Sequence, residues 1–321
     1  MTITPKTKGY DLFVGIDWSG AKGQYHPGIQ VASLGLDHSP PKLIAAPNGK
    51  AWSRQGVMDY LKGEAENKRV LAGFDFAFAH PFMDKEGYYP GFGTPPSDAA
   101  ALWQMVDAIN QDHSHLYGGG IWGHNDLGLY YNHQKSPPNN PDKSRNDLFV
   151  SRRRQTENAA REHHKVTPSP TFNCIGAAGV GTGSLAGMRL LHHLALSAHI
   201  WPFHETDERG QGDGQSAKKT LTLVEIYPAL YFNMAGVSDE AKKSEPLAAI
   251  NQGLSHFDTS PITDITSGLP DLDDLDAIIS AAALRALHDP LEVFAINTPE
   301  LKAAAAKEGW IFGVKSDKKA S

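Results

Sequence analysis

Two short apolar runs that each end in an aspartate place the strongest constraint on how this chain folds. Phe13-Val14-Gly15-Ile16 leads into Asp17, and Val70-Leu71-Ala72-Gly73-Phe74 leads into Asp75. Neither run alternates apolar with polar residues, which is typical of strands that are buried on both faces. An aspartate in such a place is costly to bury unless it is paired or binds a cation. We therefore expect an α/β fold in which both runs are strands of one sheet.

The first 75 residues predict the element order β-β-β-α-β. We expect strands at 11–17, 28–36 and 42–46, then a helix at 52–65 that Ser53 can cap, then a strand at 70–75. Three strands in quick succession fit an antiparallel meander. The helix then returns the fourth strand parallel to the first and beside it. A fifth strand is expected at 220–226, which gives a mixed five-stranded sheet flanked by helices.

The region after the fourth strand is long and rich in Gly, Pro, Asn and aromatic residues. We interpret residues 76–200 as an insert or lid within a single domain that spans residues 1–321, because loop-rich segments beside a catalytic strand commonly shape a substrate site. Apolar periodicity predicts helices at 97–111, 184–198, 238–252, 271–288 and 299–308.

Composition narrows the class of protein. The 321 residues are 40% hydrophobic and 21% charged, and no run approaches the roughly 18 apolar residues of a membrane span. Cys174 is the only cysteine and the N-terminus lacks an apolar signal core, so we expect a soluble, cytoplasmic protein with no membrane partner. The formal net charge of −6 argues against a basic protein that coats nucleic acid, although local patches still permit a nuclease.

Asp273 and Asp276 extend the acidic pattern to a C-terminal helix. Their i, i+3 spacing places them on one helix face. Acidic residues in a first turn favour the helix dipole, which explains Asp271 and Asp273 but not Asp276, further inside the helix. If these carboxylates lie close to Asp17 and Asp75, the like charges repel each other, and a bound divalent cation usually neutralises such a group.

Glu225 and an arginine run are further candidates. Glu225 lies inside the strand Leu223-Val224-Glu225-Ile226, where a glutamate needs a partner, so it is either salt-bridged to an arginine or functional. Residues 151–165 carry five Lys or Arg against two Glu, and Arg152, Arg153 and Arg154 are candidates for phosphate contacts. A solvated helix with internal ion pairs is the alternative for this patch.

The order of these motifs resembles the ribonuclease H-like superfamily. More closely, the chain resembles a bacterial family of unknown function (domain of unknown function 429) whose members are predicted to be RNase H-like nucleases. The segments that carry the resemblance are Val14–Gly20, Gly73–Asp75, Arg153–Glu157, Trp201–Phe203, Val224–Pro228, Asp273–Ala277 and Glu308–Ile311. Asp17, Asp75, Asp273 and Asp276 match the places of the acidic residues in Holliday-junction resolvases of the superfamily.

The resemblance implies an RNase H-like fold and a metal site that takes Mg²⁺ or Mn²⁺. Our leading hypothesis is a nuclease that hydrolyses phosphodiester bonds of RNA or DNA with two ions about 3.5–4 Å apart. Asp17 would bridge the two ions, Asp75 would hold one, and Asp273 and Asp276 the other. Glu225 would be an extra ligand or would orient the attacking water. Substrate structure and oligomeric state stay open at this point.

Two alternatives belong to other classes. Gly15-Ile16-Asp17 followed by Ser19-Gly20 loosely resembles the first phosphate loop of the sugar-kinase and actin superfamily, which binds ATP. Gly176–Ser184 precedes a helix and is interpreted as a flexible entry turn, with a phosphate cradle as its alternative. A catalytically silent binding protein with the same fold is the third hypothesis, favoured by the acidic net charge.

Overall fold

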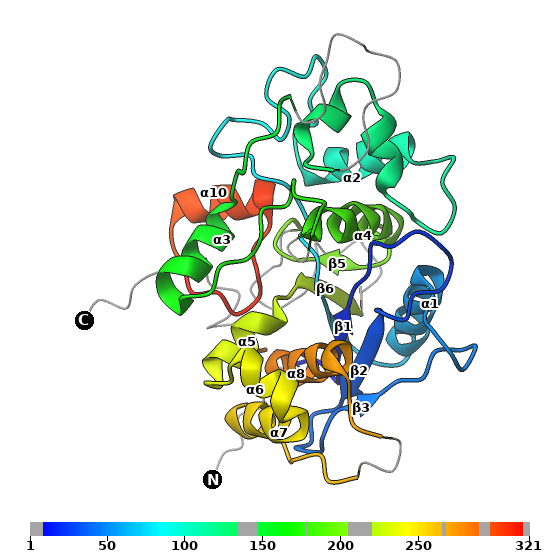
Figure 1. Cartoon of the computed structure of the whole chain (residues 1–321), viewed down its shortest axis with the longest axis vertical. Coiled ribbons are helices and arrows are strands. Elements are labelled where there is room, and N and C mark those ends of the chain that lie inside the picture. The colour runs from blue at the N-terminus through cyan, green and yellow to red at the C-terminus, as the bar shows by residue number, and fades with distance from the viewer. Residues whose placement is uncertain are drawn as a thin grey trace, which may run out of the picture.

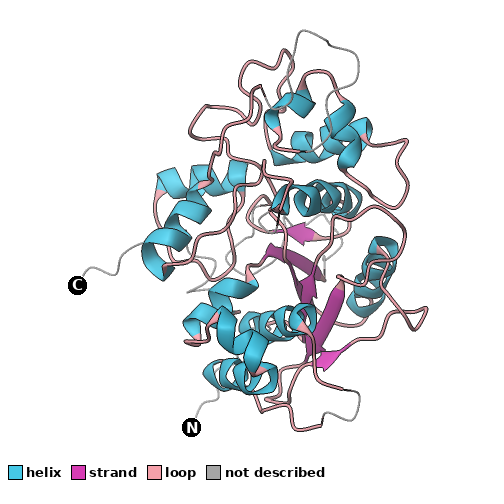
Figure 2. Cartoon of the chain, viewed as in Figure 1, coloured by secondary structure: helices cyan, strands magenta, loops and turns pink. Residues whose placement is uncertain are grey.

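A mixed six-stranded sheet lies at the centre of the structure (Figures 1 and 2). The computed structural model describes residues 9–133, 147–176, 179–204, 220–264, 268–288 and 296–316. The strands are β1 (Leu12–Asp17), β2 (Gln30–Leu34), β3 (Lys42–Leu43), β4 (Val70–Phe74), β5 (His199–Ile200) and β6 (Leu221–Glu225), in the order β3-β2-β1-β4-β6-β5. Strands β1, β2 and β3 pair antiparallel, and the pairs β1–β4, β4–β6 and β5–β6 are parallel.

The predicted meander and the parallel return of the fourth strand are both confirmed. The prediction of five strands is wrong by one, because the short β5 adds to the edge of the sheet beside β6. A strand of two residues, His199 and Ile200, has no periodicity that a sequence pattern can reveal. It also lies at the end of the range interpreted as the insert, so the last part of that range belongs to the sheet.

Helices cover both faces of the sheet. They are α1 (Arg54–Ala65), α2 (Ala99–Ile109), α3 (Gln155–Ala159), α4 (Val180–Leu194), α5 (Pro228–Met234), α6 (Asp239–Ser244), α7 (Pro246–His256), α8 (Leu272–Leu287) and α10 (Pro299–Glu308), with short turns η1 (Gly119–Gly123), η2 (Leu127–Tyr130) and η3 (Ala160–His164). No helix among the described residues is both long enough and apolar enough to cross a membrane.

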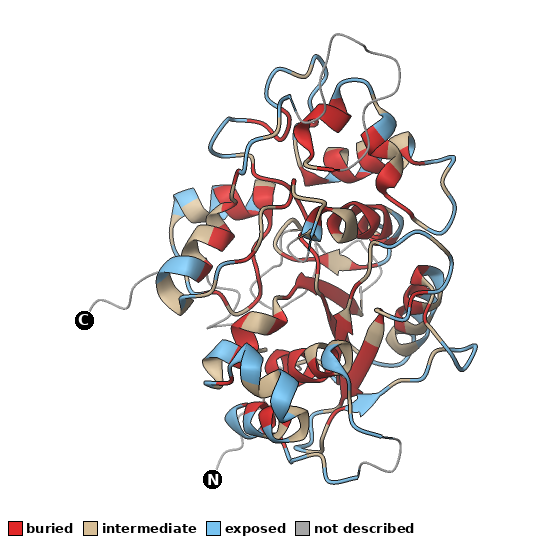
Figure 3. Ribbon diagram, viewed as in Figure 1, coloured by how far each residue is buried: buried red, intermediate tan, exposed pale blue. Residues whose placement is uncertain are grey.

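Alternate residues of β1 point into two separate cores. Val14 and Ile16 join a cluster with side chains of α1, α2 and α4, and Phe13 joins one with side chains of α5, α7 and α8. Figure 1 shows α1 and α8 on opposite sides of β1 and β2. Figure 3 shows that the strands and the inward sides of these helices are buried. The strands without alternation are therefore buried on both faces, as their sequence predicts.

Local sequence explains where most helices begin. The Ser53 hydroxyl accepts a bond of 2.9 Å from the Gly56 amide, as expected of an N-cap, and Asp98 caps α2 in the same way. The helix expected at 238–252 is two helices, because Pro246 cannot donate a backbone hydrogen bond and instead starts α7. The helix expected at 184–198 begins four residues earlier, at Val180.

Candidate active site

The two aspartates that end the apolar runs lie on neighbouring strands. Strands β1 and β4 are parallel, and Ile16 is in register with Phe74. The residue after each of these is an aspartate, and the Asp75 amide donates a hydrogen bond of 3.0 Å to the Ile16 carbonyl. Asp17 and Asp75 therefore leave the sheet side by side at its carboxyl-terminal edge. The expectation that their strands are adjacent is confirmed.

A glycine on β1 lets α8 bring Asp276 to the same edge. A methyl group placed on Gly15 would collide with the Ala277 carbonyl and would lie 2.6 Å from the Ala281 amide nitrogen. The helix backbone thus packs directly on the strand, which requires glycine on β1 and small residues on α8. Asp276 precedes that contact by one residue and Asp17 follows Gly15 by two. The close approach therefore carries one carboxylate toward the other.

The carboxyl groups of Asp17, Asp75 and Asp276 influence one another electrostatically. Burial, then the charges of Asp75, Asp276 and Asp273, raise the pKa of Asp17 to about 9. The pKa of Asp75 is raised well above its usual range, mainly by burial and next by the negative charge of Asp276. Burial raises the pKa of Asp276 to about 6, although Lys242 opposes the shift. Mutual repulsion of this kind is typical of carboxylates that share a site without enough positive charge.

Asp273 lies at the margin of this group. Its Oδ2 atom is close to the loop before β2, since a methyl group on Gly28 would lie 3.4 Å away. Its charge affects Asp17 and Asp276, but it is not among the charges that shift the pKa of Asp75. Asp271 and Asp274 instead form the capping box of α8, with the Asp274 amide 2.9 Å from Asp271 Oδ1. We call Asp17, Asp75, Asp273 and Asp276 the aspartate cluster.

Glu225 belongs to a second acidic group that is fully paired. Its carboxylate accepts two hydrogen bonds from Arg154, of 2.5 and 2.7 Å, and one of 3.0 Å from the Phe78 amide. Arg154 also donates to Glu157 at 2.9 Å and to the Glu308 carbonyl at 3.0 Å. All four side chains are buried. Of the two interpretations of Glu225, the salt bridge to an arginine is the one that the structure shows.

The remaining bonds of this second group tie the insert to the C-terminal helix. Glu308 Oε1 accepts from the Phe82 and Met83 amides at 2.7 and 2.8 Å, and Glu308 Oε2 accepts from the Gln155 amide at 2.7 Å. We call Arg154, Glu157, Glu225 and Glu308 the glutamate cluster. Its carboxylates accept hydrogen bonds from two parts of the chain, residues 78–83 and residues 154–155, so each has donors without a metal.

The three consecutive arginines have separate roles. Arg152 is buried, pairs with Asp84 at 2.5 Å and donates to the carbonyls of Pro81, Gly87 and Tyr88. Arg154 holds the glutamate cluster. Guanidinium groups that are engaged so fully have no donors directed at a phosphate, so we withdraw both as phosphate ligands. Arg153 is half-buried and donates to the Pro168 carbonyl. Burial raises the pKa of Tyr227 to about 12, and the nearby Arg153 charge opposes that shift.

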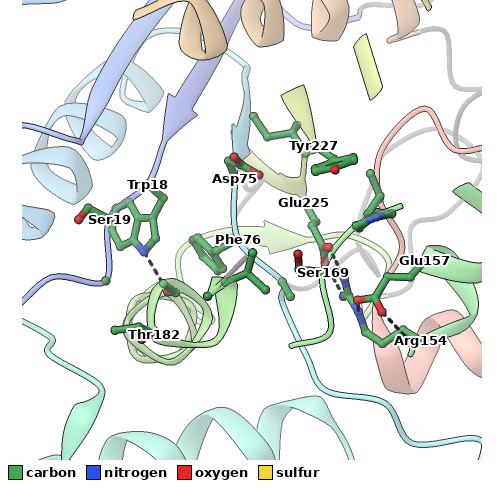
Figure 4. A pocket seen from close by; sticks show the side chains of 18 of the residues that line it. Trp18, Ser19, Asp75, Phe76, Arg154, Glu157, Ser169, Thr182, Glu225 and Tyr227 are labelled. Carbon is green, nitrogen blue, oxygen red and sulfur yellow. Dashed lines mark hydrogen bonds and ion pairs between the residues drawn. The ribbon is translucent and has the colours of Figure 1, made fainter. Parts of the chain in front are cut away.

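A cavity of about 400 Å³ opens between the two acidic groups (Figure 4). Asp75 lines one side and the Arg154–Glu225 pair lines the other, with Phe76 and Ser169 between them. Trp18, Ser19 and Gly20 after β1 meet the start of α4, where Trp18 Nε1 donates to the Gly183 carbonyl at 3.2 Å. The volume is in the range of small-molecule and substrate pockets. Asp75 is the member of the aspartate cluster that lines this cavity.

The aspartate cluster suits a hard divalent cation in chemistry and in charge, since all its donors are carboxylate oxygens in an excess of negative charge. Within the described ranges, however, no three His, Cys, Asp or Glu side chains stand close enough together to hold one ion. The cluster is therefore not a closed chelate. Mg²⁺ in other proteins is commonly held by one or two carboxylates and completes its shell with water and substrate phosphates.

Sequence reasoning overlooked Lys242 and the pocket side chains of Ser169 and Thr182. Lys242 lies on α6, and its Nζ atom is 3.4 Å from Asp276 Oδ1. The only signal in the sequence is its i, i+3 spacing from Asp239, which predicts a surface ion pair. Compared with known proteins, the chain matches no family model, no curated protein and no solved structure.

Proposed function

We propose that this protein is a divalent-cation-dependent phosphodiester hydrolase of the RNase H-like fold that acts on nucleic acid. The observation that carries the proposal is the convergence of Asp17, Asp75 and Asp276 at one sheet edge, with the pKa of each carboxyl raised by burial and like charge. The strand order and directions of the sheet are consistent with RNase H-like topology.

Asp17 and Asp75 are the residues that would hold Mg²⁺ or Mn²⁺, because they emerge side by side from adjacent central strands. The ion, when bound, polarises a phosphoryl oxygen and makes a bound water a better nucleophile. Both carboxylates must be ionised to act as ligands, so binding of the ion releases the protons that their raised pKa values retain. Asp276 adds negative charge that favours a cation at this edge.

The chain's own residues would place the substrate across the rim of the cavity. Phe76 and Tyr227 line the cavity beside Asp75 and offer aromatic surface to a base or sugar. Arg153 remains the candidate for a phosphate contact among the three arginines, since it lies near Tyr227 and is only half-buried. Arg154 and Glu225 form the wall of the cavity opposite Asp75, and their ion pair has a structural role.

Cleavage assays with Mn²⁺ test this proposal. RNA, DNA and branched duplexes are incubated with the full chain, and with Asp17→Asn and Asp75→Asn. Loss of either ligand is expected to lower cleavage at least about a hundredfold, because the ion is lost with it. Asp59→Asn, an exposed aspartate of α1, is the matched control and keeps wild-type activity. Robust cleavage by both ligand variants would overturn the proposal.

An ATP-dependent phosphotransferase of the sugar-kinase and actin type is the second candidate. One observation favours it: Gly20 after β1 packs against Thr182 and Gly183 at the start of α4, so two glycine-bearing turns line the cavity together. Proteins of that class usually duplicate the sheet domain, whereas the described residues form one sheet. Calorimetric titration with ATP separates the two candidates. Tight binding of ATP would favour the phosphotransferase, whereas the nuclease proposal predicts no tight binding of ATP.

A catalytically silent binding protein is the third possibility. It predicts that Mn²⁺ neither binds to the aspartate cluster nor promotes cleavage of any of the three nucleic acids. The same assays therefore separate all three functions.

A further inference from the structure

Lys242 is held at the aspartate cluster by three contacts. Its Nζ atom lies 3.4 Å from Asp276 Oδ1 and 3.5 Å from Asp239 Oδ1. The same ammonium stands 4.6 Å from the centre of the Phe232 ring, a cation–π distance. Only 11% of the side chain is exposed, compared with 82% for Asp239. Asp276 and the Phe232 ring are therefore the principal contacts of Lys242, whereas the ion pair with Asp239 is exposed to solvent.

The position of this ammonium matters for the charge of the site. Burial raises the pKa of both Asp75 and Asp276, and the charge of Lys242 opposes the rise in each. A second divalent ion at Asp276 would meet a positive charge already within ion-pair distance of its ligand, and the two cations would repel each other.

We propose that Lys242 supplies the second positive charge of this centre, so that the chain binds a single divalent ion, at Asp17 and Asp75. This inference rests on the proposed function and replaces the arrangement of two ions that the sequence predicts. Asp276 then acts as the partner of Lys242, and Asp273 as an outlying carboxylate. The ammonium supplies charge and hydrogen-bond donors toward a phosphate oxygen without requiring its own set of metal ligands.

Calorimetric titration of the metal-free full chain with Mn²⁺ alone tests the inference. The wild-type chain is expected to bind one ion. Lys242→Met keeps the aliphatic stem on Phe232 but removes the charge, so this variant is expected to bind Mn²⁺ at least about tenfold more tightly or to take up a second ion. Lys242→Arg keeps the charge and is expected to bind one ion with wild-type affinity.

Lys243→Met is the matched control, because it removes the same charge from an exposed neighbour on α6. It is expected to leave Mn²⁺ binding unchanged. Thermal unfolding of each variant shows that it is folded before titration. Two ions in the wild-type chain, or equal binding by Lys242→Met and Lys243→Met, would overturn the role of Lys242 while leaving a metal-dependent hydrolase in place. Absence of Mn²⁺ binding in every variant would overturn both proposals.

Discussion

Asp75 of the aspartate cluster and the Arg154–Glu225 pair of the glutamate cluster line one cavity, yet the two clusters differ in how their buried negative charge is balanced. In the glutamate cluster, Arg154 and several backbone amides provide donors for Glu157, Glu225 and Glu308. In the aspartate cluster, the Trp18 amide donates to Asp17 and Lys242 pairs with Asp276, but burial and repulsion still raise the pKa of each of the three main carboxyls.

This difference indicates that the glutamate cluster stabilises the fold and that the aspartate cluster is the candidate binding site. Carboxylates with complete sets of donors stabilise the packing of the insert against α10 and β6. Carboxylates that repel each other cost stability, and such a cost is common where a site is built to receive a ligand. Figure 4 shows both kinds at one cavity, with Asp75 across from the Arg154–Glu225 pair.

Removal of Arg154 should give the largest change in stability, because it removes the cation of the glutamate cluster. Arg154→Met leaves Glu157 and Glu225 buried without their cation, which is expected to lower the free energy of unfolding by about 3–5 kcal/mol. Urea denaturation measures the change. Arg153→Met, at a half-buried neighbour, is the control and should cost less than about 1 kcal/mol. Equal losses in the two variants would show that the cluster is not held by Arg154.

Gly15→Ala should separate the aspartates without altering any of them. The added methyl group forces α8 away from β1, and such overpacking costs about 1–3 kcal/mol. The pKa of Asp17 should then fall toward its ordinary value, because Asp276 recedes. NMR titration of the carboxyl groups detects this shift. An unchanged Asp17 pKa in a destabilised protein would mean that α8 does not set the repulsion.

Asp17→Asn should change stability in the opposite direction from Arg154→Met. In metal-free solution at pH 8, it removes one repelling carboxyl, so the free energy of unfolding is expected to rise by at least about 1.4 kcal/mol, the equivalent of one pKa unit. If the proposed function is correct, the same substitution is also expected to lower Mn²⁺-dependent cleavage at least about a hundredfold. Chemical denaturation in the presence of a chelator measures the gain, with Asp59→Asn as the control. A loss of stability would contradict the account of this cluster.

Per pH unit, the smallest expected effect is the dependence of stability on pH. The pKa values of Asp276 and Asp17 are raised in the folded chain to about 6 and about 9, so their contribution is complete below their ordinary pKa near 4 and is lost as pH rises through these values. Stability of the metal-free protein should therefore fall from about pH 4 to about pH 9, by less than about 1.4 kcal/mol per pH unit for each proton, with Asp276 contributing up to about pH 6 and Asp17 up to about pH 9.

The two aspartate variants assign that pH dependence to its groups. Asp276→Asn should flatten the lower part of the decline and Asp17→Asn the upper part. Glu157, whose pKa burial raises to about 7 against the opposing effect of Arg154, adds a decline that both variants retain. Denaturation curves across this range measure the slopes, and identical slopes in wild type and both variants would contradict the assignment.

The sequence was sufficient for the parts of the fold that depend on local pattern. Unbroken apolar runs predicted β1 and β4, and capping residues such as Ser53 located helix starts. The break at Pro246 was readable but was missed within a longer periodic stretch. The two-residue β5 could not be predicted, because its pairing with β6 is set by tertiary packing.

For the site, sequence reasoning found the aspartates but not their partners. A strand-end aspartate is unusual enough to single out Asp17 and Asp75. The partners of Arg152, Arg154 and Lys242 come from distant parts of the chain. Three arginines in a row therefore indicate phosphate contacts, with a solvated patch as the alternative, and nothing in the sequence singles out Lys242. Long-range pairing of charges depends on the folded arrangement and leaves no local pattern.

Anomalous scattering from a crystal of the protein soaked in Mn²⁺ tests the central claim most directly. The account predicts one peak within about 2.6 Å of carboxylate oxygens of Asp17 and Asp75, and none between Glu157 and Glu225. A peak at the glutamates, or no peak at the aspartates when Mn²⁺ is in large excess, would contradict it.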